Sequence, residues 1–275
     1  MTASNPPSDP FPLYEEHQGD TPLLVASPHV GLRLTPDIAA HMNETGLKVG
    51  ETDFNVHRLF DFAPSIGAST QFALYNRYVI DLNRDPAGQS FYPGQFETNL
   101  CPLSDFDGHR LYPSAEEPDE AEITRRRQIF FEPYHTALRQ KLKALRDKHG
   151  YALLIDAHSV RPAIPNLFKG RLPDINIGTH DQRACAPFVV KAIKAWMEDE
   201  RFYSTILDGR FKGGYTTRHH GDPANHIHAV QFEIVQDTYL DMNAPHLFDP
   251  ERALPMSLAV KSLTEALLSA LKTAY

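Results

Sequence analysis

Cysteine is scarce in this sequence, which has only two, Cys101 and Cys185, among 275 residues. They could form one bridge at most, and they lack the spacing of a metal-binding pair. The first twenty residues also lack the basic and apolar regions of a secretory signal. We therefore expect free thiols in a reducing compartment and a cytoplasmic protein.

Long apolar runs and clustered positive charge are missing as well. No run approaches the roughly eighteen apolar residues of a membrane span, so no membrane segment is expected. The formal net charge is -8, whereas a nucleic-acid-binding surface needs concentrated positive charge. We expect neither a membrane nor nucleic acid as a partner, and a small anionic ligand would need a few locally placed arginines. The sequence indicates no oligomeric state.

The order of the apolar patterns predicts one α/β domain over residues 1–275. Predicted strands alternate with predicted helices, which favours a mostly parallel mixed sheet with helices on both faces. Residues 1–20 are rich in proline and polar groups and are expected to be irregular. Residues 85–118 have many Gly, Pro and Asp residues and little periodicity. Loops of that length are usually functional, so we interpret this region as a lid or substrate-binding loop.

The stretch 150–160 is the clearest predicted strand. Five apolar residues follow Gly150, a run typical of a parallel strand buried on both faces. Asp156, His158 and Ser159 come next, at the carboxyl end, where open α/β sheets bind ligands. A carboxylate beside a histidine can also hold one ring nitrogen while the other binds a metal.

The remaining elements are predicted from periodicity and from turn residues. A helix should begin at Pro36, and Pro133 should kink or split the helix over 118–149, which Gly150 ends. The predicted strands are 23–26, 70–74, 78–82, 174–178, 204–207 and 229–235; the other predicted helices are 56–62, 184–200 and 250–272; and 208–221 is predicted to be a polar loop.

Two histidines and nearby acids fall at predicted strand ends. His29 and His158, with Glu51 or Asp53, could form the two-histidine, one-carboxylate shell of a catalytic zinc ion. Such an ion polarises a carbonyl and lowers the pKa of a water molecule, as amide hydrolysis requires. Glu233 is the candidate general base, because a carboxylate within an apolar strand is costly to bury without a purpose or a partner.

Arginines complete the pattern, because a guanidinium can bind a carboxylate through two parallel hydrogen bonds. Arg84, at the end of a predicted strand, and Arg218, in the loop over 208–221, are the best placed, and Lys212 could add positive charge. Together they suggest a substrate with one or more carboxylates.

Plainer interpretations stay open for several of these residues. Asp53 could cap a following helix. The role of Asp81 could be limited to an ion pair that holds the guanidinium of Arg77 or Arg84 in place. Glu233 could be a structural acid paired with Arg210 or Arg218. In that case mutation would cost stability, whereas loss of a catalytic base would leave a folded, inactive enzyme.

Several motifs occur in a fixed order between about residues 23 and 239. They are Ser27-Pro28-His29-x-Gly31, Thr52-Asp53, Arg77-Tyr78-Val79-Ile80-Asp81-Leu82-Asn83-Arg84, Asp156-Ala157-His158-Ser159, Gly209-Arg210-Phe211-Lys212-Gly213-Gly214-Tyr215-x-Thr217-Arg218-His219 and His228-Ala229-Val230-Gln231-x-Glu233. This ordered set resembles the N-formylglutamate amidohydrolases, which are more distantly similar to zinc carboxypeptidases and aspartoacylases.

The resemblance implies a zinc-carboxypeptidase-like fold and metal-dependent hydrolysis of N-formyl-L-glutamate to formate and L-glutamate, in histidine degradation. Leu32 stands where the wider group has a glutamate ligand, so Asp53 is chosen as the third ligand over Glu51. The implied roles are metal ligation, most simply of Zn²⁺, by His29, Asp53 and His158; catalysis by Glu233 and Arg84; and binding of a small dicarboxylate substrate by Asn83, Arg84, Lys212, Tyr215 and Arg218.

Two other functions remain open from the sequence. The same site could hydrolyse a different N-acyl acidic amino acid, or the chain could bind an acidic metabolite without catalysis. The sequence also does not decide which arginine binds which substrate carboxylate.

Overall fold

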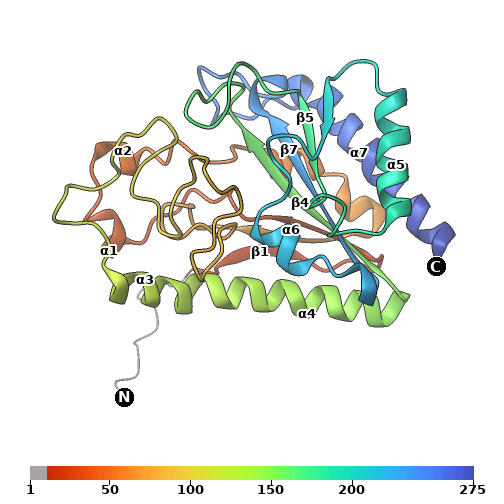
Figure 1. Ribbon diagram of the computed structural model, residues 1–275, viewed down its shortest axis with the longest axis horizontal. Coiled ribbons are helices and arrows are strands. Elements are labelled where there is room, and N and C mark those ends of the chain that lie inside the picture. Colours follow the sequence, from red (N-terminus) through yellow and green to blue (C-terminus); the bar gives the residue numbers. More distant parts are fainter. Residues whose placement is uncertain (1–10) are drawn as a thin grey trace.

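A mixed sheet of seven strands lies at the centre of the computed structural model, which describes residues 11–275 (Figure 1). In chain order the helices and strands are β1 (Tyr14–His17), β2 (Leu23–Ser27), α1 (Pro36–Ala39), α2 (Glu44–Leu47), η1 (Val56–Phe60), η2 (Ala63–Ile66), β3 (Ser69–Ala73), α3 (Glu120–Arg126), η3 (Arg127–Phe131), α4 (Glu132–His149), β4 (Ala152–Val160), β5 (Ile175–Gly178), α5 (Pro187–Asp199), β6 (Thr205–Leu207), α6 (Tyr215–His220), η4 (Pro223–Asn225), β7 (Ile227–Val235), η5 (Gln236–Thr238) and α7 (Pro250–Ala274).

The strand order is β1-β3-β2-β4-β7-β5-β6. The four strands β3, β2, β4 and β7 are parallel to one another, whereas β1 is antiparallel to β3 and β5 is antiparallel to β7. This mostly parallel, mixed sheet flanked by helices confirms the predicted α/β class. It also brings the carboxyl ends of β2, β4 and β7 to one edge, where the predicted site residues are expected to meet.

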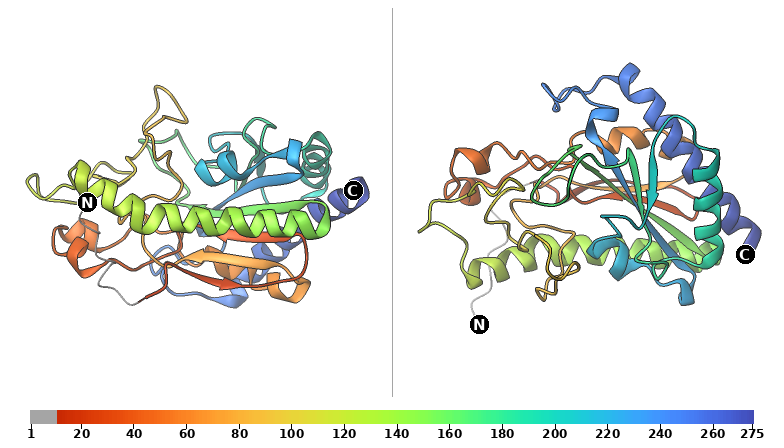
Figure 2. Two further views of the ribbon diagram at one scale, coloured as in Figure 1. Left: turned by 90° about the horizontal axis from the view of Figure 1, so that it is seen from below. Right: turned by 45° about the horizontal axis from the view of Figure 1, so that its top comes forward.

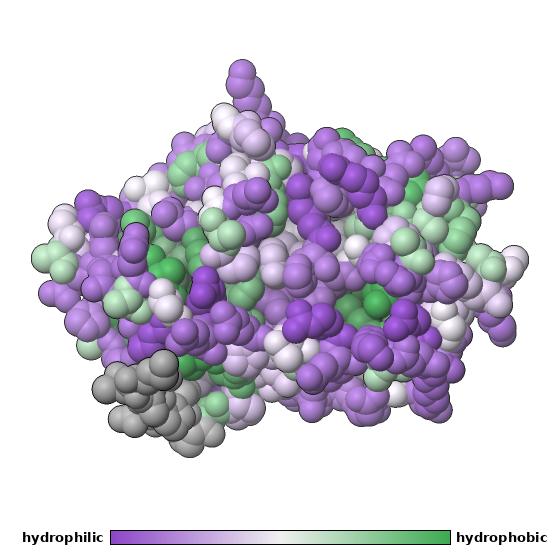
Figure 3. Space-filling view, turned by 60° about the horizontal axis from the view of Figure 1, so that its bottom comes forward, coloured by the Kyte–Doolittle hydropathy of each residue, from purple (hydrophilic) through white to green (hydrophobic). Residues whose placement is uncertain are grey.

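Both faces of the sheet are buried, and the strand sequences explain why. Successive side chains of a strand point to opposite faces, so Leu23 and Val25 belong to one apolar core while Leu24 and Ala26 belong to the other. Helix α4 covers one face, and α5 and α7 cover the opposite face (Figure 2). On the outer side of α4 the surface is mainly hydrophilic, with small separate apolar areas (Figure 3).

Helix α7 is long and apolar enough to cross a membrane by length and composition alone. One stripe of this helix, which includes Met256, Val260 and Leu263, is buried in the core against the sheet. On another side Lys261 approaches Glu265 to 3.9 Å. This division into a buried and a charged side is typical of a core helix in a globular domain.

The predicted long helix over 118–149 is divided near Pro133, as expected. Helix α3 passes into the π-helical turn η3, and α4 continues from Glu132. Proline has no N–H to donate and its ring crowds the preceding turn, and a π-helical turn absorbs this irregularity. Gly150 ends α4 with φ 84° and donates its N–H to the carbonyl of Arg146.

Three local predictions are wrong. Residues 78–82 form turns instead of a strand: the N–H of Val79 bonds to Asn76 O and that of Asp81 to Leu100 O. Their apolar character reflects burial in the core, which does not require a strand. The segment over 1–20 was predicted to be irregular; residues 1–10 lie outside the described residues, and in the remainder Tyr14–His17 forms the edge strand β1. Its exposed, polar composition gave no strand signal. The loop over 208–221 contains the short helix α6.

Residues 85–118 form no helix or strand. Near its end, Asp105 N–H bonds to His109 O and Leu111 N–H to Leu103 O, so a tight turn closes this part of the region. Part of the region lies over the carboxyl ends of the strands, because Tyr92, Phe96 and Phe106 line the same pocket as strand residues. Its interpretation as a lid stays a prediction.

Candidate active site

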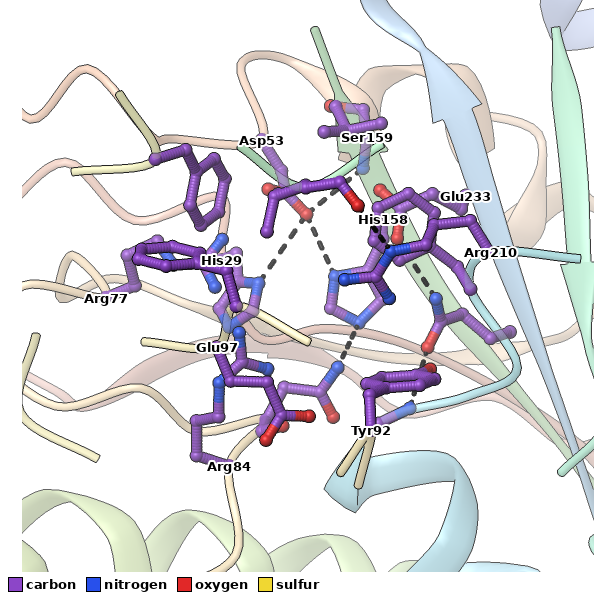
Figure 4. A pocket seen from close by; sticks show the side chains of 18 residues that line it. His29, Asp53, Arg77, Arg84, Tyr92, Glu97, His158, Ser159, Arg210 and Glu233 are labelled. Atoms are coloured by element: carbon purple, nitrogen blue, oxygen red, sulfur yellow. Dashed lines mark hydrogen bonds and ion pairs between the residues drawn. The ribbon is translucent and has the colours of Figure 1, made fainter. Parts of the chain in front are cut away.

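Three predicted ligands, His29, Asp53 and His158, lie together at the carboxyl edge of the parallel strands (Figure 4). His29 follows β2, Asp53 lies in the turn before η1, and His158 belongs to β4. One donor atom from each lies within 4.8 Å of the other two, and all three side chains are buried. The group could hold a metal ion.

Each of the two histidines directs its Nδ1 atom toward Asp53. Asp53 Oδ2 lies 2.9 Å from His158 Nδ1 and 3.8 Å from His29 Nδ1. Each Nε2 faces a second carboxylate: His29 Nε2 is 2.7 Å from Asp81 Oδ1, and His158 Nε2 is 2.9 Å from Asp156 Oδ1. A carboxylate that accepts Nε2–H leaves Nδ1 unprotonated and oriented for a metal.

This geometry agrees with the expected role of Asp156 and adds one for Asp81. Asp81 does accept from Arg77 Nη2 at 2.6 Å, as the plainer interpretation had it, but its other oxygen holds His29. The contact with His29 could not be predicted, because the two residues lie fifty-two positions apart and meet only through the fold.

The structure separates the two candidate acids, Asp53 and Glu51. Asp53 Oδ2 also accepts the N–H of Ser159 at 3.1 Å, and the N-cap position of η1 belongs to Asn55, not to Asp53. Glu51 faces away from the histidines, toward the N–H of Phe106 and the guanidinium of Arg161 at 3.3 Å. Burial raises the pKa of Glu51 to about 7, against the opposing effect of Arg161. Asp53 is therefore the acid that joins the histidines.

Electrostatics around the three donors favour a cation. Burial and the nearby Arg77 lower the pKa of His29, so its imidazole is neutral. Burial also disfavours the charged form of His158, but Asp156 and Asp53 raise its pKa well above the ordinary value. Three buried carboxylates, those of Asp53, Asp81 and Asp156, surround the two imidazoles. Their positive partners at under 3 Å among the described residues are the guanidinium of Arg77 and, in the absence of a metal, the protonated ring of His158. A divalent ion would balance this excess.

Glu233 lies on β7, opposite His158 of β4 in the strand register. Its side chain is buried, and burial raises its pKa to about 8. Oε2 accepts a hydrogen bond of 3.0 Å from Gln231 Nε2. Among residues 11–275 Glu233 forms no ion pair with Arg210 or Arg218, although Arg210 attracts it electrostatically at longer range. A buried carboxyl with a pKa near neutrality suits proton transfer.

These groups line a pocket of ≈ 60 Å³. Its wall also includes residues from the loop regions on either side of the site. The lining residues are His29, Asp53, Arg77, Asn83, Arg84, Tyr92, Phe96, Glu97, Phe106, His158, Ser159, Val160, Leu167, Arg210, Phe211, Gly214, Gln231 and Glu233.

Two arginines that line the pocket have capacity for an anion. Arg84, predicted from the sequence, donates to the carbonyl and the hydroxyl of Thr98 at 3.2 and 3.1 Å. Arg210 donates Nε–H to Leu167 O at 2.9 Å, and its buried Nη1 has no hydrogen-bond partner among the described residues. Sequence reasoning treated Arg210 only as a possible partner of Glu233. Its place in the same motif as Arg218 was the one available signal.

Asn83 also lines the pocket, and the backbone N–H of Thr216 fixes the oxygen end of its amide. Nδ2 lies 3.1 Å from His158 Nε2, and Oδ1 accepts the N–H of Thr216 at 2.8 Å. Asn83 and Arg84 are therefore the two predicted substrate-binding residues that the fold brings to the pocket.

The other three predicted substrate-binding residues do not line this pocket. Lys212 pairs with Asp181 at 2.8 Å, and the ring of Tyr215 stacks on His219 at 4.6 Å between centroids. Arg218 donates Nε–H to Gly213 O and places its guanidinium 4.6 Å from the ring centre of Phe91. Arg218 thus contacts the region over 85–118, including the ring of the pocket residue Tyr92, whose centre lies 5.4 Å from the guanidinium carbon.

The chain is similar to known proteins along most of its length. Residues 21–240 match the sequence model of a family described as N-formylglutamate amidohydrolase. The chain is 42% identical to the N-formylglutamate deformylase of Pseudomonas putida over 253 residues, and equally to that of Pseudomonas aeruginosa over 252, with 92% of this chain and 94% of each relative covered. A crystal structure of N-formylglutamate amidohydrolase from Ralstonia eutropha has the same fold, with a TM-score of 0.72, 22% identity and coverage of 95% of this chain and 99% of that one. The chain belongs to the N-formylglutamate amidohydrolase family.

Proposed function

We propose that this protein hydrolyses N-formyl-L-glutamate to formate and L-glutamate with one divalent metal ion. The observation that carries the proposal is the buried group of His29, Asp53 and His158, which shares one pocket with the carboxyl of Glu233. The relatives named N-formylglutamate deformylase, 42% identical over nearly the whole chain, support the substrate and the reaction.

His29 Nδ1, Asp53 and His158 Nδ1 would hold the metal. Nitrogen and carboxylate donors in this number are typical of catalytic zinc, so we propose Zn²⁺. When bound, the ion would polarise the formyl carbonyl and lower the pKa of a water molecule. Asp81 and Asp156 would hold both imidazoles in the tautomer that leaves Nδ1 free.

Glu233 is the proposed general base and acid. Its carboxylate takes one proton from the attacking water as the hydroxyl oxygen bonds to the formyl carbon. The same proton then passes to the amide nitrogen as the carbon–nitrogen bond breaks, which releases formate and the amine of glutamate. Positive charge on Arg84, which lines the pocket, would stabilise the anionic tetrahedral intermediate.

The two carboxylates of the substrate need two cationic partners. We propose Arg84, with Asn83 beside it, for one carboxylate and Arg210 for the other. The unpartnered Nη1 of Arg210 supports this choice, because a buried guanidinium nitrogen without an acceptor is costly. Arg210 takes the place that the sequence had suggested for Arg218, and Lys212 and Tyr215 are left out because their side chains lie outside the pocket.

Substrate entry would require the region over 85–118 to open. The pocket of ≈ 60 Å³ has room for only a few water molecules, and formylglutamate is larger than that. Tyr92 closes one side: its hydroxyl accepts the N–H of Lys212 at 3.0 Å, and Arg210 lies 4.8 Å from its ring centre. Because Tyr92 is held by these few contacts, we expect the region over 85–118 to move and the sheet to stay in place.

We also propose that the enzyme acts in the cytoplasm, at the formylglutamate-consuming end of histidine degradation. Cys101 and Cys185 are both buried free thiols, which suits a reducing compartment. The names of the bacterial relatives support the reaction that such a route would need.

Formate release from N-formyl-L-glutamate tests the proposal. The wild-type protein should release stoichiometric formate, lose this activity after treatment with a strong zinc chelator and regain it on addition of Zn²⁺. N-acetyl-L-aspartate and N-formyl-L-leucine serve as controls for the acyl group and the second carboxylate. A preference for either control, or full activity in the chelated protein, would overturn the substrate or the metal requirement respectively.

A further inference from the structure

Gln231 is buried beside Glu233, the proposed general base, and takes no part in the proposed steps of the reaction. It stands two residues before Glu233 on β7, so both side chains point to the same face of the sheet. Gln231 Nε2 donates to Glu233 Oε2 at 3.0 Å, and the Gln231 side chain lines the pocket. This amide is therefore in a position to control the direction of the Glu233 carboxylate.

The opposite end of the Gln231 amide is also fixed. Oε1 accepts the backbone N–H of Gly214 at 3.0 Å. A carbonyl oxygen must face an N–H donor, so this bond decides that the NH₂ end, and not the oxygen, faces Glu233. The orientation of the amide follows from the backbone and needs no water molecule to define it.

The turn that supplies this N–H is itself tightly constrained. Gly213 has φ 107°, a conformation that disfavours any residue with a side chain. A Cβ on Gly214 would lie 2.3 Å from Asn83 Nδ2, so only glycine allows this approach. The turn therefore holds Gln231 in one place, and Gln231 transmits that position to Glu233.

We propose that Gln231 is a positioning residue for the reaction. By occupying Oε2 of Glu233, its amide leaves Oε1 to exchange the proton with water and with the leaving nitrogen. The inference rests on the proposed function of Glu233. Among the described residues no lysine or arginine forms an ion pair with this carboxylate, so loss of the amide leaves it free to rotate. Small misplacements of a catalytic group reduce turnover strongly.

Thr217 offers a matched comparison within the same region. Its hydroxyl donates to Asp156 Oδ2 at 2.8 Å, and the other oxygen of Asp156 faces His158. Thr217 and Gln231 are both buried polar residues. Gln231 bonds to the turn at Gly214, and Thr217 lies in α6, the helix that follows this turn. One supports a proposed metal ligand and the other supports the proposed base, so their substitutions should give different kinetic signatures.

The experiment is a double-mutant cycle of Gln231→Met with Glu233→Gln, measured by formate release. Methionine keeps the length of the side chain and removes the hydrogen bonds. Gln231→Met should lower kcat about 10- to 100-fold, with KM changed less than threefold and zinc content unchanged. In the Glu233→Gln background it should cause no further loss, because the group it positions is gone. Thr217→Val should instead lower zinc affinity.

A second variant guards against misfolding. Gln231→Asn keeps an amide but is too short to bridge Gly214 and Glu233, and it should also lower kcat with KM preserved. Wild-type kcat in a folded Gln231→Met or Gln231→Asn protein would overturn the inference, as would an equal loss in the Glu233→Gln background. A wild-type protein that releases no formate would instead overturn the proposed function, so the two failures are distinguishable.

Discussion

The floor and the outer wall of the pocket are held in place by different means. We define the floor as His29, Asp53, His158, Gln231 and Glu233, and the wall as Tyr92, Phe96, Glu97, Phe106, Arg210 and Phe211. The floor is carried mainly by β2, β4 and β7 or the turns beside them, and its polar atoms are joined by buried hydrogen bonds.

The wall comes from regions without strands. Arg210 contacts the rings of Tyr92 and Phe211 at 4.8 and 5.3 Å from its guanidinium carbon, and one hydrogen bond joins Lys212 to Tyr92. Contacts of this kind are weaker than buried charged hydrogen bonds. Under the proposed function, the chemistry therefore falls on the strands with buried hydrogen bonds, and substrate selection and entry fall on the loops around them.

The largest expected effect comes from changing the base on the floor. Glu233→Gln should lower kcat about 10²- to 10⁴-fold, the usual contribution of a general base. Zinc content and the unfolding temperature should be retained, because glutamine keeps the size of the side chain and an oxygen that can accept from Gln231, and the metal group is left intact. Steady-state kinetics and calorimetry measure both. A large fall in stability with modest loss of activity would indicate a structural acid instead.

The next largest effects are expected from the two carboxylates that bind Nε2 of the histidines, Asp81 and Asp156. Asp156→Asn and Asp81→Asn should each lower zinc affinity about 10- to 100-fold, because an amide no longer fixes the imidazole tautomer. Asp81→Asn should also cost about 3 kcal/mol of unfolding free energy, since it leaves Arg77 buried without an anionic partner. Zinc titration and urea unfolding separate the two effects. Equal stability of both variants would show that the pair with Arg77 matters little.

A third prediction concerns pH and a histidine pair behind the pocket. His135 Nδ1 lies 3.0 Å from His220 Nε2, and its Nε2 donates to Leu82 O, next to Asn83. Burial lowers the pKa of His135 to about 3. Between pH 6.5 and 3 the unfolded chain therefore binds a proton that the folded chain does not, so stability falls as the pH falls.

From pH 7 to pH 5 this histidine should contribute a loss of about 2 kcal/mol in unfolding free energy. His135→Gln should reduce the pH dependence in that window, as measured by urea unfolding at several pH values. An unchanged slope would mean that His135 already takes up a proton in the folded state. Either result bears on how rigidly the segment before Asn83 is held.

The smallest expected effects belong to the wall, where Arg210 and Arg218 form a matched pair. Arg210→Ala should raise KM for formylglutamate about tenfold or more, the cost of one charged hydrogen bond. Arg218→Ala loses its contacts with the rings of Phe91 and Tyr92 and one bond to Gly213, and should change KM about threefold at most. Steady-state kinetics with both variants measures these changes. A larger rise in KM for Arg218→Ala than for Arg210→Ala would contradict the choice of Arg210 as the substrate-binding residue.

The same contrast explains what the sequence could predict. The strand β4 was evident because a parallel strand buried on both faces is a continuous apolar run, and Asp156 and His158 come within three residues after that run. Glu233 was recognised because a carboxylate interrupts a similar run in β7. Such signals are local, so they need no knowledge of the tertiary structure.

Features that depend on turns and on contacts between distant segments could not be predicted. Arg210 and Arg218 are eight residues apart, and the turn at Gly213 and the helix α6 after it decide which one enters the pocket. The apolar run over 78–82 imitates a strand but is buried as turns, because the core surrounds it on all sides. The contact between Asp81 and His29 likewise arises only when distant segments meet.

Anomalous diffraction at the zinc edge, recorded from crystals grown with Zn²⁺, tests the central claim most directly. We predict one peak per chain, bound by Nδ1 of His29, a carboxylate oxygen of Asp53 and Nδ1 of His158, and lost in Asp53→Asn. A peak elsewhere with none at these three residues would contradict the account.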